Sequence, residues 1–323
     1  MPPCRREILP LLEQGVIPAD KTDAALAVAG ITPDAKAWKT FIDHLLLWLG
    51  GLALSFAVMF FVAYNWSEIG RMGKFALVEG LIILAVAAYW KLDDHAMGGK
   101  VALFAATLLL GVLLALFGQT YQTGADPWQL FFTWALLMLP WAIVGRFPAI
   151  WLVWIVLINL SIILYHQVLR GVFGLMFGSD NSMLWLTFAV NAFALMAWEV
   201  LSKPWPWLAE RWAIRLLAVG SGVPLTWLVI FGIVDREHGP VLAGAAWGVW
   251  LAVMVFVYRR KRPDLFMLAG CCLSGIVVVV TFLGRHLLEK GEAGSLLILA
   301  LVIIGLGAGS AVWLRNVHRE WQA

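Results

Sequence analysis

Charged residues are scarce in this chain of 323 residues. They make up 13% of it, whereas about a quarter of the residues in a soluble domain are charged. Hydrophobic residues make up 62%, which is more than a single soluble core of this length can remove from water. This imbalance excludes an ordinary soluble protein. The net charge of +3 is spread over polar segments and indicates no nucleic-acid partner.

Cysteine is nearly absent as well. Cys4, Cys271 and Cys272 have neither the spacing of a disulfide framework nor that of metal ligands. No nucleotide-binding loop, serine elbow or zinc-binding helix motif occurs. A cleavable signal peptide is not expected, because the N-terminus is polar and the first long apolar run starts near Leu45. The sequence therefore predicts no catalytic residue, no metal and no cofactor, and the protein is not expected to be an enzyme.

Long apolar runs are what the sequence has instead. A helix needs about 20 apolar residues to cross the roughly 30 Å hydrocarbon core of a membrane, and runs of this kind recur with polar segments between them. Tryptophan, which prefers the membrane interface, flanks many of them. The predicted fold class is an all-α, polytopic membrane helix bundle. Ten transmembrane helices are expected, near residues 41–64, 74–90, 100–118, 128–145, 147–166, 183–201, 212–234, 240–258, 265–283 and 294–314.

The basic residues predict an orientation for these helices. If the N-terminus is cytoplasmic, most of the 23 Lys and Arg residues fall on the cytoplasmic side, as the positive-inside rule requires. The run from Arg259 to Arg262 contributes strongly, and it is interpreted as a topology anchor or as an anionic-lipid site. Both termini are therefore expected in the cytoplasm.

Three segments are expected along the chain. Residues 1–40 should form a small cytoplasmic helical hairpin, with helices over Arg5–Gln14 and from Pro18 to near Gly30. The segment Thr32-Pro33-Asp34 should open a helix that runs into the membrane. Residues 41–166 should form a first five-helix half, and residues 167–323 a second five-helix half with a short basic C-terminal tail.

Two polar stretches lie at the predicted outer face, after the first and the third span. Their hydrogen-bonding side chains alternate with aromatic rings, which suits an uncharged polar or cationic ligand, or a partner protein. Six residues in them are candidate ligand contacts: Asn65, Glu68, Gln119, Tyr121, Gln122 and Asp126. The alternatives are structural. Asn65 and Glu68 can cap helix ends, residues 119–122 can form a solvated loop, and Asp126 can open a capping box with Gln129.

These stretches also resemble a bacterial family of predicted membrane proteins, domain of unknown function 2157. The resemblance rests on the short N-terminal hairpin, on Val62-Ala63-Tyr64-Asn65-Trp66 before a helix that begins at Lys74, and on the residues from Gly118 to Asp126. It covers roughly the first 145 residues. It implies a multi-pass protein of the bacterial inner membrane and supplies no catalytic residue.

Two features inside the spans indicate transport. Glu79 lies about five residues into the second span, where an ionisable group is costly and usually faces an interior or aqueous cavity. The alternative is structural: the side chain reaches outward to the headgroup region or pairs with Arg71 or Lys74. Gly220, Gly222 and Pro224 are expected to break the seventh span, as in many transporters, or to form a kink that serves packing.

Other polar residues in the spans have structural interpretations. Asn159 and Asn191 are expected to form hydrogen bonds between helices. Glu199 and Arg215 lie near the inner ends of their spans, and their side chains are expected to reach the headgroup region.

Two functions from different classes follow. The first is a transporter-like protein for a small solute, with an outward-facing polar site between the spans near 74–90, 100–118 and 212–234. Glu79 would carry a proton or cation there, and Gln119 and Tyr121 would contact the ligand. The second is a non-transporting membrane scaffold or regulator that binds a protein partner through its outer loops. In both cases the lipid bilayer surrounds the protein.

Overall fold

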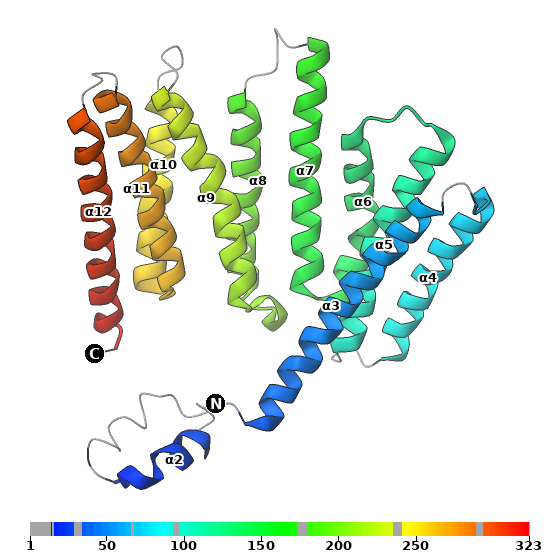
Figure 1. Cartoon of the computed structure of the whole chain (residues 1–323), viewed down its shortest axis with the longest axis horizontal. Helices are drawn as coiled ribbons and strands as arrows, with labels where there is room; N and C mark the ends of the chain where they lie inside the picture. The colour runs from blue at the N-terminus through cyan, green and yellow to red at the C-terminus, as the bar shows by residue number, and fades with distance from the viewer. Residues whose placement is uncertain are drawn as a thin grey trace. The chain divides into compact units, whose positions relative to one another are not determined.

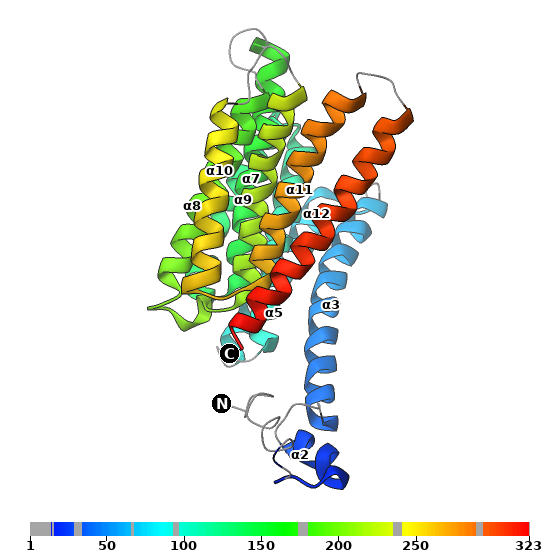
Figure 2. The same cartoon turned by 90° about the vertical axis from the view of Figure 1, so that its left-hand side faces the viewer.

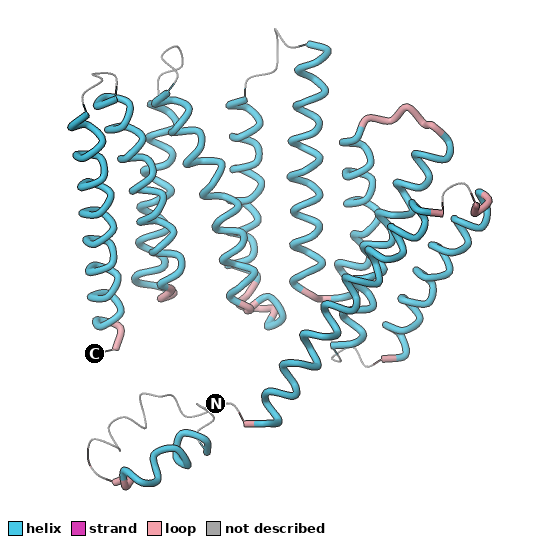
Figure 3. Tube along the Cα trace, in the orientation of Figure 1, coloured by secondary structure: helices cyan, strands magenta, loops and turns pink. Residues whose placement is uncertain are grey.

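The described part of the chain is helical. The computed structural model describes residues 14, 16–28, 34–65, 68–92, 97–173, 180–234, 241–288 and 293–322. Within these ranges helices are joined by short loops, and no strand occurs (Figure 3). The predicted all-α fold class is confirmed.

The chain divides into two compact units, Met1–Thr120 and Tyr121–Ala323, and each is described by itself. The first unit contains a short 3₁₀ turn, η1 (Ala19–Lys21), and the helices α2 (Thr22–Val28), α3 (Ala35–Tyr64), α4 (Arg71–Lys91) and α5 (Met97–Tyr121), which ends at the boundary. The side chain of Asp34 accepts a hydrogen bond from the Ala37 amide at 2.7 Å. Asp34 therefore caps α3, and the helix starts at the end of the segment predicted to open it. The helix expected over residues 5–14 lies outside the described residues, Gln14 excepted.

The second unit holds the remaining helices. They are α6 (Pro127–Gly145), α7 (Pro148–Phe173), α8 (Asp180–Leu201), η2 (Pro206–Leu208), α9 (Arg211–Val234), α10 (Val241–Phe256), the π-helical turn η3 (Val257–Lys261), α11 (Leu265–Leu288) and α12 (Ala293–Glu320). Helices α8 to α11 stand side by side in both views of the chain (Figures 1 and 2). Consecutive helices run in opposite directions because the loops between them are short.

Ten helices in the described part of the chain are long and apolar enough to cross a membrane, with η3 continuing the span of α10. Large apolar side chains cover their outer surfaces: Phe60 is 65% exposed and Val241 is 80% exposed. A soluble protein rarely exposes such continuous apolar surface, so these faces are suited to lipid. The helices also extend beyond the predicted ends of the transmembrane spans. For example, α12 ends at Glu320, whereas the last span was predicted to end near residue 314. A helix keeps its backbone hydrogen bonds when its polar end leaves the hydrocarbon.

The first unit has its own core. Val58 and Val62 of α3, Val78 of α4 and Leu109 and Leu116 of α5 form one buried cluster. The ring of Trp48 meets that of Phe104 edge to face, with centroids 5.1 Å apart. These contacts join α3, α4 and α5 into one bundle.

The second unit includes α6 and α7 as well as α8 to α12. The reason lies in the side chains of α7. Ser161 donates a hydrogen bond to the Trp128 carbonyl of α6 at 3.2 Å, while Ile155 of α7 belongs to the same buried cluster as Leu195 of α8 and Leu217 of α9.

Candidate functional site

The first outer motif ends α3. Asn65 is the C-cap residue, and both its backbone N–H and its side-chain Nδ2 donate to the Phe61 carbonyl, at 3.0 and 2.9 Å. The structural interpretation of Asn65 as a cap is therefore confirmed. Glu68 is exposed. Trp66 and Ser67, also part of this motif, lie outside the described residues.

The second outer motif ends α5 and opens α6. Gln119, Tyr121 and Gln122 are exposed, and Gln122 has a φ of 46°, in the left-handed region that commonly ends helices. Asp126 is the N-cap of α6, as predicted, but its side chain makes no capping hydrogen bond. Instead, its backbone carbonyl accepts from the Gln129 amide at 3.0 Å. The predicted capping box is wrong in this respect.

Glu79 lies on an exposed face of α4. Residues three, four or seven positions apart share one face of a helix, and Met72, Ala76 and Ile83, which stand at such spacings from Glu79, are also exposed. Val78, by contrast, is fully buried against α3 and α5. The carboxyl group therefore points away from the core of its unit, among apolar neighbours.

The seventh predicted span is not broken. α9 is one continuous helix from Arg211 to Val234, with Pro224 inside it. The predicted break at Gly220, Gly222 and Pro224 is wrong, because the helix continues on both sides of Pro224. Ser221 donates to the Ala218 carbonyl at 3.0 Å, and Thr226 donates to the Gly222 carbonyl at 2.7 Å.

The two glycines of this stretch serve packing. A Cβ atom at Gly220 would lie 2.8 Å from Oδ1 of Asn191, and one at Gly222 would lie 2.8 Å from Cη2 of Trp250. Asn191 is itself held by Asn159: its Nδ2 donates to Asn159 Oδ1 at 2.6 Å, and Asn159 Nδ2 donates back at 3.3 Å. The predicted hydrogen bonds between the two asparagine-bearing helices are confirmed.

Replacing Gly220 by alanine is therefore expected to destabilise the protein by about 1–2 kcal/mol, because the new methyl group displaces the Asn191 amide from its partner. SDS titration in mixed micelles measures this free energy of unfolding. In an Asn191→Ala background, Gly220→Ala should lower the free energy of unfolding by less, since the Asn191 amide that the new methyl group displaces is absent. Equal costs in both backgrounds would contradict the proposed packing.

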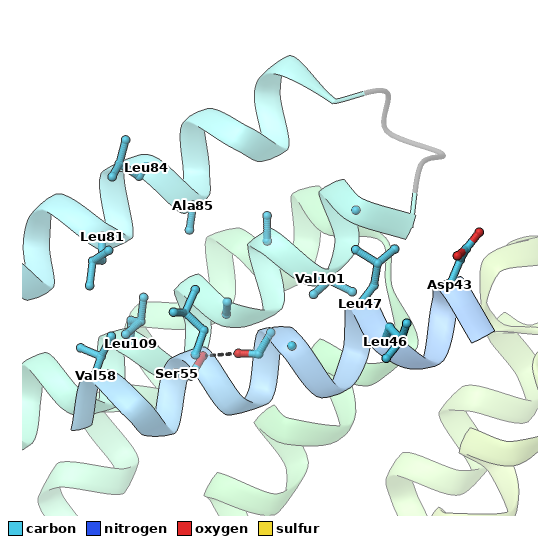
Figure 4. Close-up of a pocket in the computed structure, with 16 residues that line it drawn as sticks. Asp43, Leu46, Leu47, Ser55, Val58, Leu81, Leu84, Ala85, Val101 and Leu109 are labelled. Atoms are coloured by element: carbon cyan, nitrogen blue, oxygen red, sulfur yellow. Dashed lines mark hydrogen bonds between the residues drawn. The ribbon is translucent and has the colours of Figure 1, made fainter. Parts of the chain in front are cut away.

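A large cleft lies within the first unit. It has a volume of about 920 Å³ and runs between α3, α4 and α5 (Figure 4). Its walls are mostly apolar, with Leu81 and Leu109 among them, and Asp43 lies at one end. The buried hydroxyl of Ser55 donates to the Gly51 carbonyl of its own helix at 2.9 Å. The cleft suits hydrocarbon and presents little that would bind a polar solute.

Charged side chains gather at one end of the second unit, where α8, α9, η3 and α11 meet. Asp264 is buried, and its carboxylate accepts two hydrogen bonds of 3.1 Å from Arg215. It also accepts from the Phe266 amide at 3.0 Å, which caps α11. Nε of Arg211 lies 3.7 Å from the same carboxylate. The guanidinium of Arg215 also stands over the Phe266 ring, 5.4 Å from its centroid.

Glu199 is the second carboxylate of this network. It pairs with Arg262, and it accepts a hydrogen bond from the Tyr258 hydroxyl at 2.7 Å. Arg262 also donates to Ser202 and to the Glu199 carbonyl, both at 3.0 Å. Nη1 of Arg211 lies 3.7 Å from Glu199 and so links the two carboxylates.

The expectation that Glu199 and Arg215 simply extend to the headgroups is therefore wrong, because each has a charged partner within the protein. The sequence interpretation also missed Asp264. Its position between Pro263 and the apolar run that begins at Leu265 is the signal that could have revealed it, since such an aspartate is a typical N-cap.

The fold defines a multi-pass helical membrane protein. A family model described as a predicted membrane protein, domain of unknown function 2157, matches residues 10–151. This match includes both outer motifs, Glu79 and the cleft of the first unit, and the resemblance inferred from those motifs is confirmed. No curated protein and no solved structure matches the chain.

Proposed function

We propose that this protein is a non-transporting scaffold or regulator of the bacterial inner membrane that binds another membrane protein. Its contact surface is the α4 face, defined as Met72, Ala76, Glu79, Gly80 and Ile83, together with the outer motifs next to it. The observation that carries the proposal is the position of the Glu79 carboxyl group on an exposed, otherwise apolar face of a membrane helix.

An ionisable side chain in the hydrocarbon is costly, by roughly 2.5–3.5 kcal/mol for an aspartate at the centre of a helix on insertion scales. Lipid tails offer no hydrogen-bond donor that would offset this cost for Glu79. A neighbouring transmembrane helix with an Arg, Lys, Asn or Gln side chain would offer Glu79 such a donor. The occupant we propose for the α4 face is such a helix of a partner protein.

Small residues beside Glu79 support close approach of that helix. Ala76 and Gly80 are four residues apart, the spacing that lets the backbones of membrane helices come close together. A Cβ atom built at Gly80 would have no atom within 4 Å, so the space above it is open. The outer motifs add exposed polar side chains to the same end of the bundle: Glu68 precedes α4, and Gln119 and Tyr121 end α5.

Transport of a small solute remains a prediction from the sequence. It would use Glu79 as the carrier of a proton or cation, with Gln119 and Tyr121 as ligand contacts. The cleft in Figure 4 offers mostly apolar side chains, and Glu79 is not among the residues that line it. Partner binding is therefore the function that the geometry supports better.

A photo-crosslinking residue at position 83 tests the proposal in intact cells. Ile83 is 66% exposed on the α4 face, so the probe should yield one defined crosslinked membrane protein. Glu79→Leu should reduce this product at least tenfold, whereas Glu79→Gln, which keeps hydrogen-bonding capacity, should retain most of it. Both variants should keep the melting temperature of the wild type, because Glu79 is exposed.

Two controls make the result specific. A probe at Trp227, which is 50% exposed on α9, should not give the same product. Glu210→Leu, which removes an exposed carboxylate from the second unit, should leave the crosslink at position 83 unchanged. Products that contain only lipid, or a protein product that Glu79→Leu does not affect, would rule out the proposed contact.

A further inference from the structure

A cavity of about 650 Å³ lies in the second unit between α7, α8 and the turn that joins α8 to α9. Its volume is within the range of about 300–1,000 Å³ typical of small-molecule sites. None of the residues that line it is charged, and five are tryptophans: Trp151, Trp154, Trp198, Trp205 and Trp207. The cavity therefore suits a neutral, apolar molecule.

Two of these tryptophans carry buried N–H groups without an acceptor. In the described part of the chain, the buried side-chain N and O atoms that lack a hydrogen-bond partner are Thr120 Oγ1 and the Nε1 atoms of Trp151 and Trp154. Trp198 in the same wall differs, since its Nε1 donates to the Leu208 carbonyl at 3.1 Å. Buried donors are nearly always paired in proteins, so two unpaired donors beside one cavity call for an acceptor there.

The two N–H groups are available as donors to a ligand that brings an acceptor. An indole nitrogen only donates, and these two make no hydrogen bond that a rotation of the ring would break. Both side chains already line the cavity, with ring centroids 5.9 Å apart and planes at 72°. A carbonyl oxygen inside the cavity would therefore gain hydrogen bonds without the loss of an existing one.

Flat aromatic surfaces form another part of the wall. The rings of Trp205 and Trp207 are nearly parallel, at 16°, with centroids 6.2 Å apart. Aromatic rings favour offset stacking and edge-to-face contacts with other rings. This wall therefore favours a ligand with a planar ring over a simple hydrocarbon chain.

The cavity also opens toward the bilayer. Phe193 of α8 lines it and is 70% exposed, and Trp205 lines it and is 47% exposed. Because α8 is a candidate membrane span, a molecule dissolved in the lipid reaches the cavity laterally. A charged headgroup would find no counter-ion among the lining residues.

We propose that this cavity binds a neutral, lipid-soluble molecule that combines a planar ring with carbonyl acceptors, the chemistry of a quinone. Trp151 and Trp154 donate hydrogen bonds to the carbonyl oxygens, and Trp205 and Trp207 contact the ring. The site lies entirely in the second unit and does not depend on the α4 face.

Binding of decylubiquinone to the full chain in detergent micelles tests this assignment, with affinity measured from the rise in melting temperature with probe concentration. The wild type should bind the probe saturably. Trp151→Phe and Trp154→Phe keep an aromatic ring and remove only the N–H, so each should weaken binding by about two- to tenfold. Trp247→Phe is the matched control: Nε1 of Trp247 donates to Ser274 at 2.8 Å, away from the cavity, and this variant should bind as the wild type does.

Two further comparisons complete the experiment. Decylbenzene, which has the tail and a ring but no carbonyl, should bind at least tenfold more weakly than decylubiquinone. Ala194→Trp, which fills the cavity from α8, should abolish saturable binding while the unliganded protein still unfolds cooperatively. Equal binding of the two probes, unchanged affinity in both Phe variants, persistence of binding in Ala194→Trp, or a diacyl phospholipid that competes at equal concentration would each overturn the proposal.

Discussion

Replacing Asp264 by leucine is expected to lower the free energy of unfolding of the protein by about 3 kcal/mol. The substitution removes the cap of α11 and the paired hydrogen bonds from Arg215, and it leaves Arg211 and Arg215 close together without their shared carboxylate. Losing an N-cap costs about 1 kcal/mol, and breaking a buried ion pair costs several. The expected loss of stability is smaller than the sum of these two costs, because both arginines are partly exposed and can turn toward water.

SDS titration of the purified protein in mixed micelles measures this loss, and two variants locate its source. Asp264→Asn keeps an acceptor for the Phe266 amide, so it should lose only about half as much stability. Glu320→Gln removes a carboxylate that pairs with Arg259 at 3.1 Å, but this carboxylate is 59% exposed. Its loss should cost less than about 1 kcal/mol. Equal losses for Asp264→Leu and Glu320→Gln would contradict a structural role for the buried carboxylate.

Replacing each of two adjacent glycines of α3 by alanine should have different effects on the stability of the first unit. A Cβ atom at Gly51 would lie 2.5 Å from Cγ1 of Val101 on α5, whereas one at Gly50 would have no atom within 4 Å. Gly51→Ala should therefore destabilise the first unit by about 1–3 kcal/mol, because the branched Val101 side chain has little freedom to move. Gly50→Ala should be neutral or stabilising by up to about 1 kcal/mol, since alanine favours the helix.

The same SDS titration measures both variants, and each is the control of the other. Gly51→Ala combined with Val101→Ala should recover part of the lost stability, because the smaller side chain leaves room for the new methyl group. If Gly51→Ala proves as stable as Gly50→Ala, the close approach of α3 to α5 is not present in the folded protein.

Several local features of the structure could be predicted from the sequence. The segment Thr32-Pro33-Asp34 was expected to open the first membrane helix, and Asp34 caps α3 through the Ala37 amide. Asn159 and Asn191 were expected to bond between helices, because an amide inside an apolar span must find a polar partner. The break expected at Pro224 was wrong, because a proline removes only one amide donor and the rest of the helical backbone continues through it.

The pairs that organise the charged network could not be predicted in this way. Arg215 meets Asp264 across 49 residues of sequence, and Arg262 meets Glu199 across 63. Each partner looks like an ordinary interfacial residue when it is read alone. The unpaired N–H groups of Trp151 and Trp154 were equally hidden, because a tryptophan near a helix end normally indicates only an interfacial anchor.

The sequence by itself determined that this is a helical membrane protein with ten spans, because the length of an apolar run and the thickness of the bilayer are both local quantities. It also contains the two polar motifs on which the resemblance to the matching family was inferred. The tertiary structure alone decided that Glu79 faces away from its own bundle, that α9 continues through Pro224, and that five tryptophans enclose one cavity. These properties depend on which helix faces meet, and in a bilayer every face is apolar enough to meet lipid or protein.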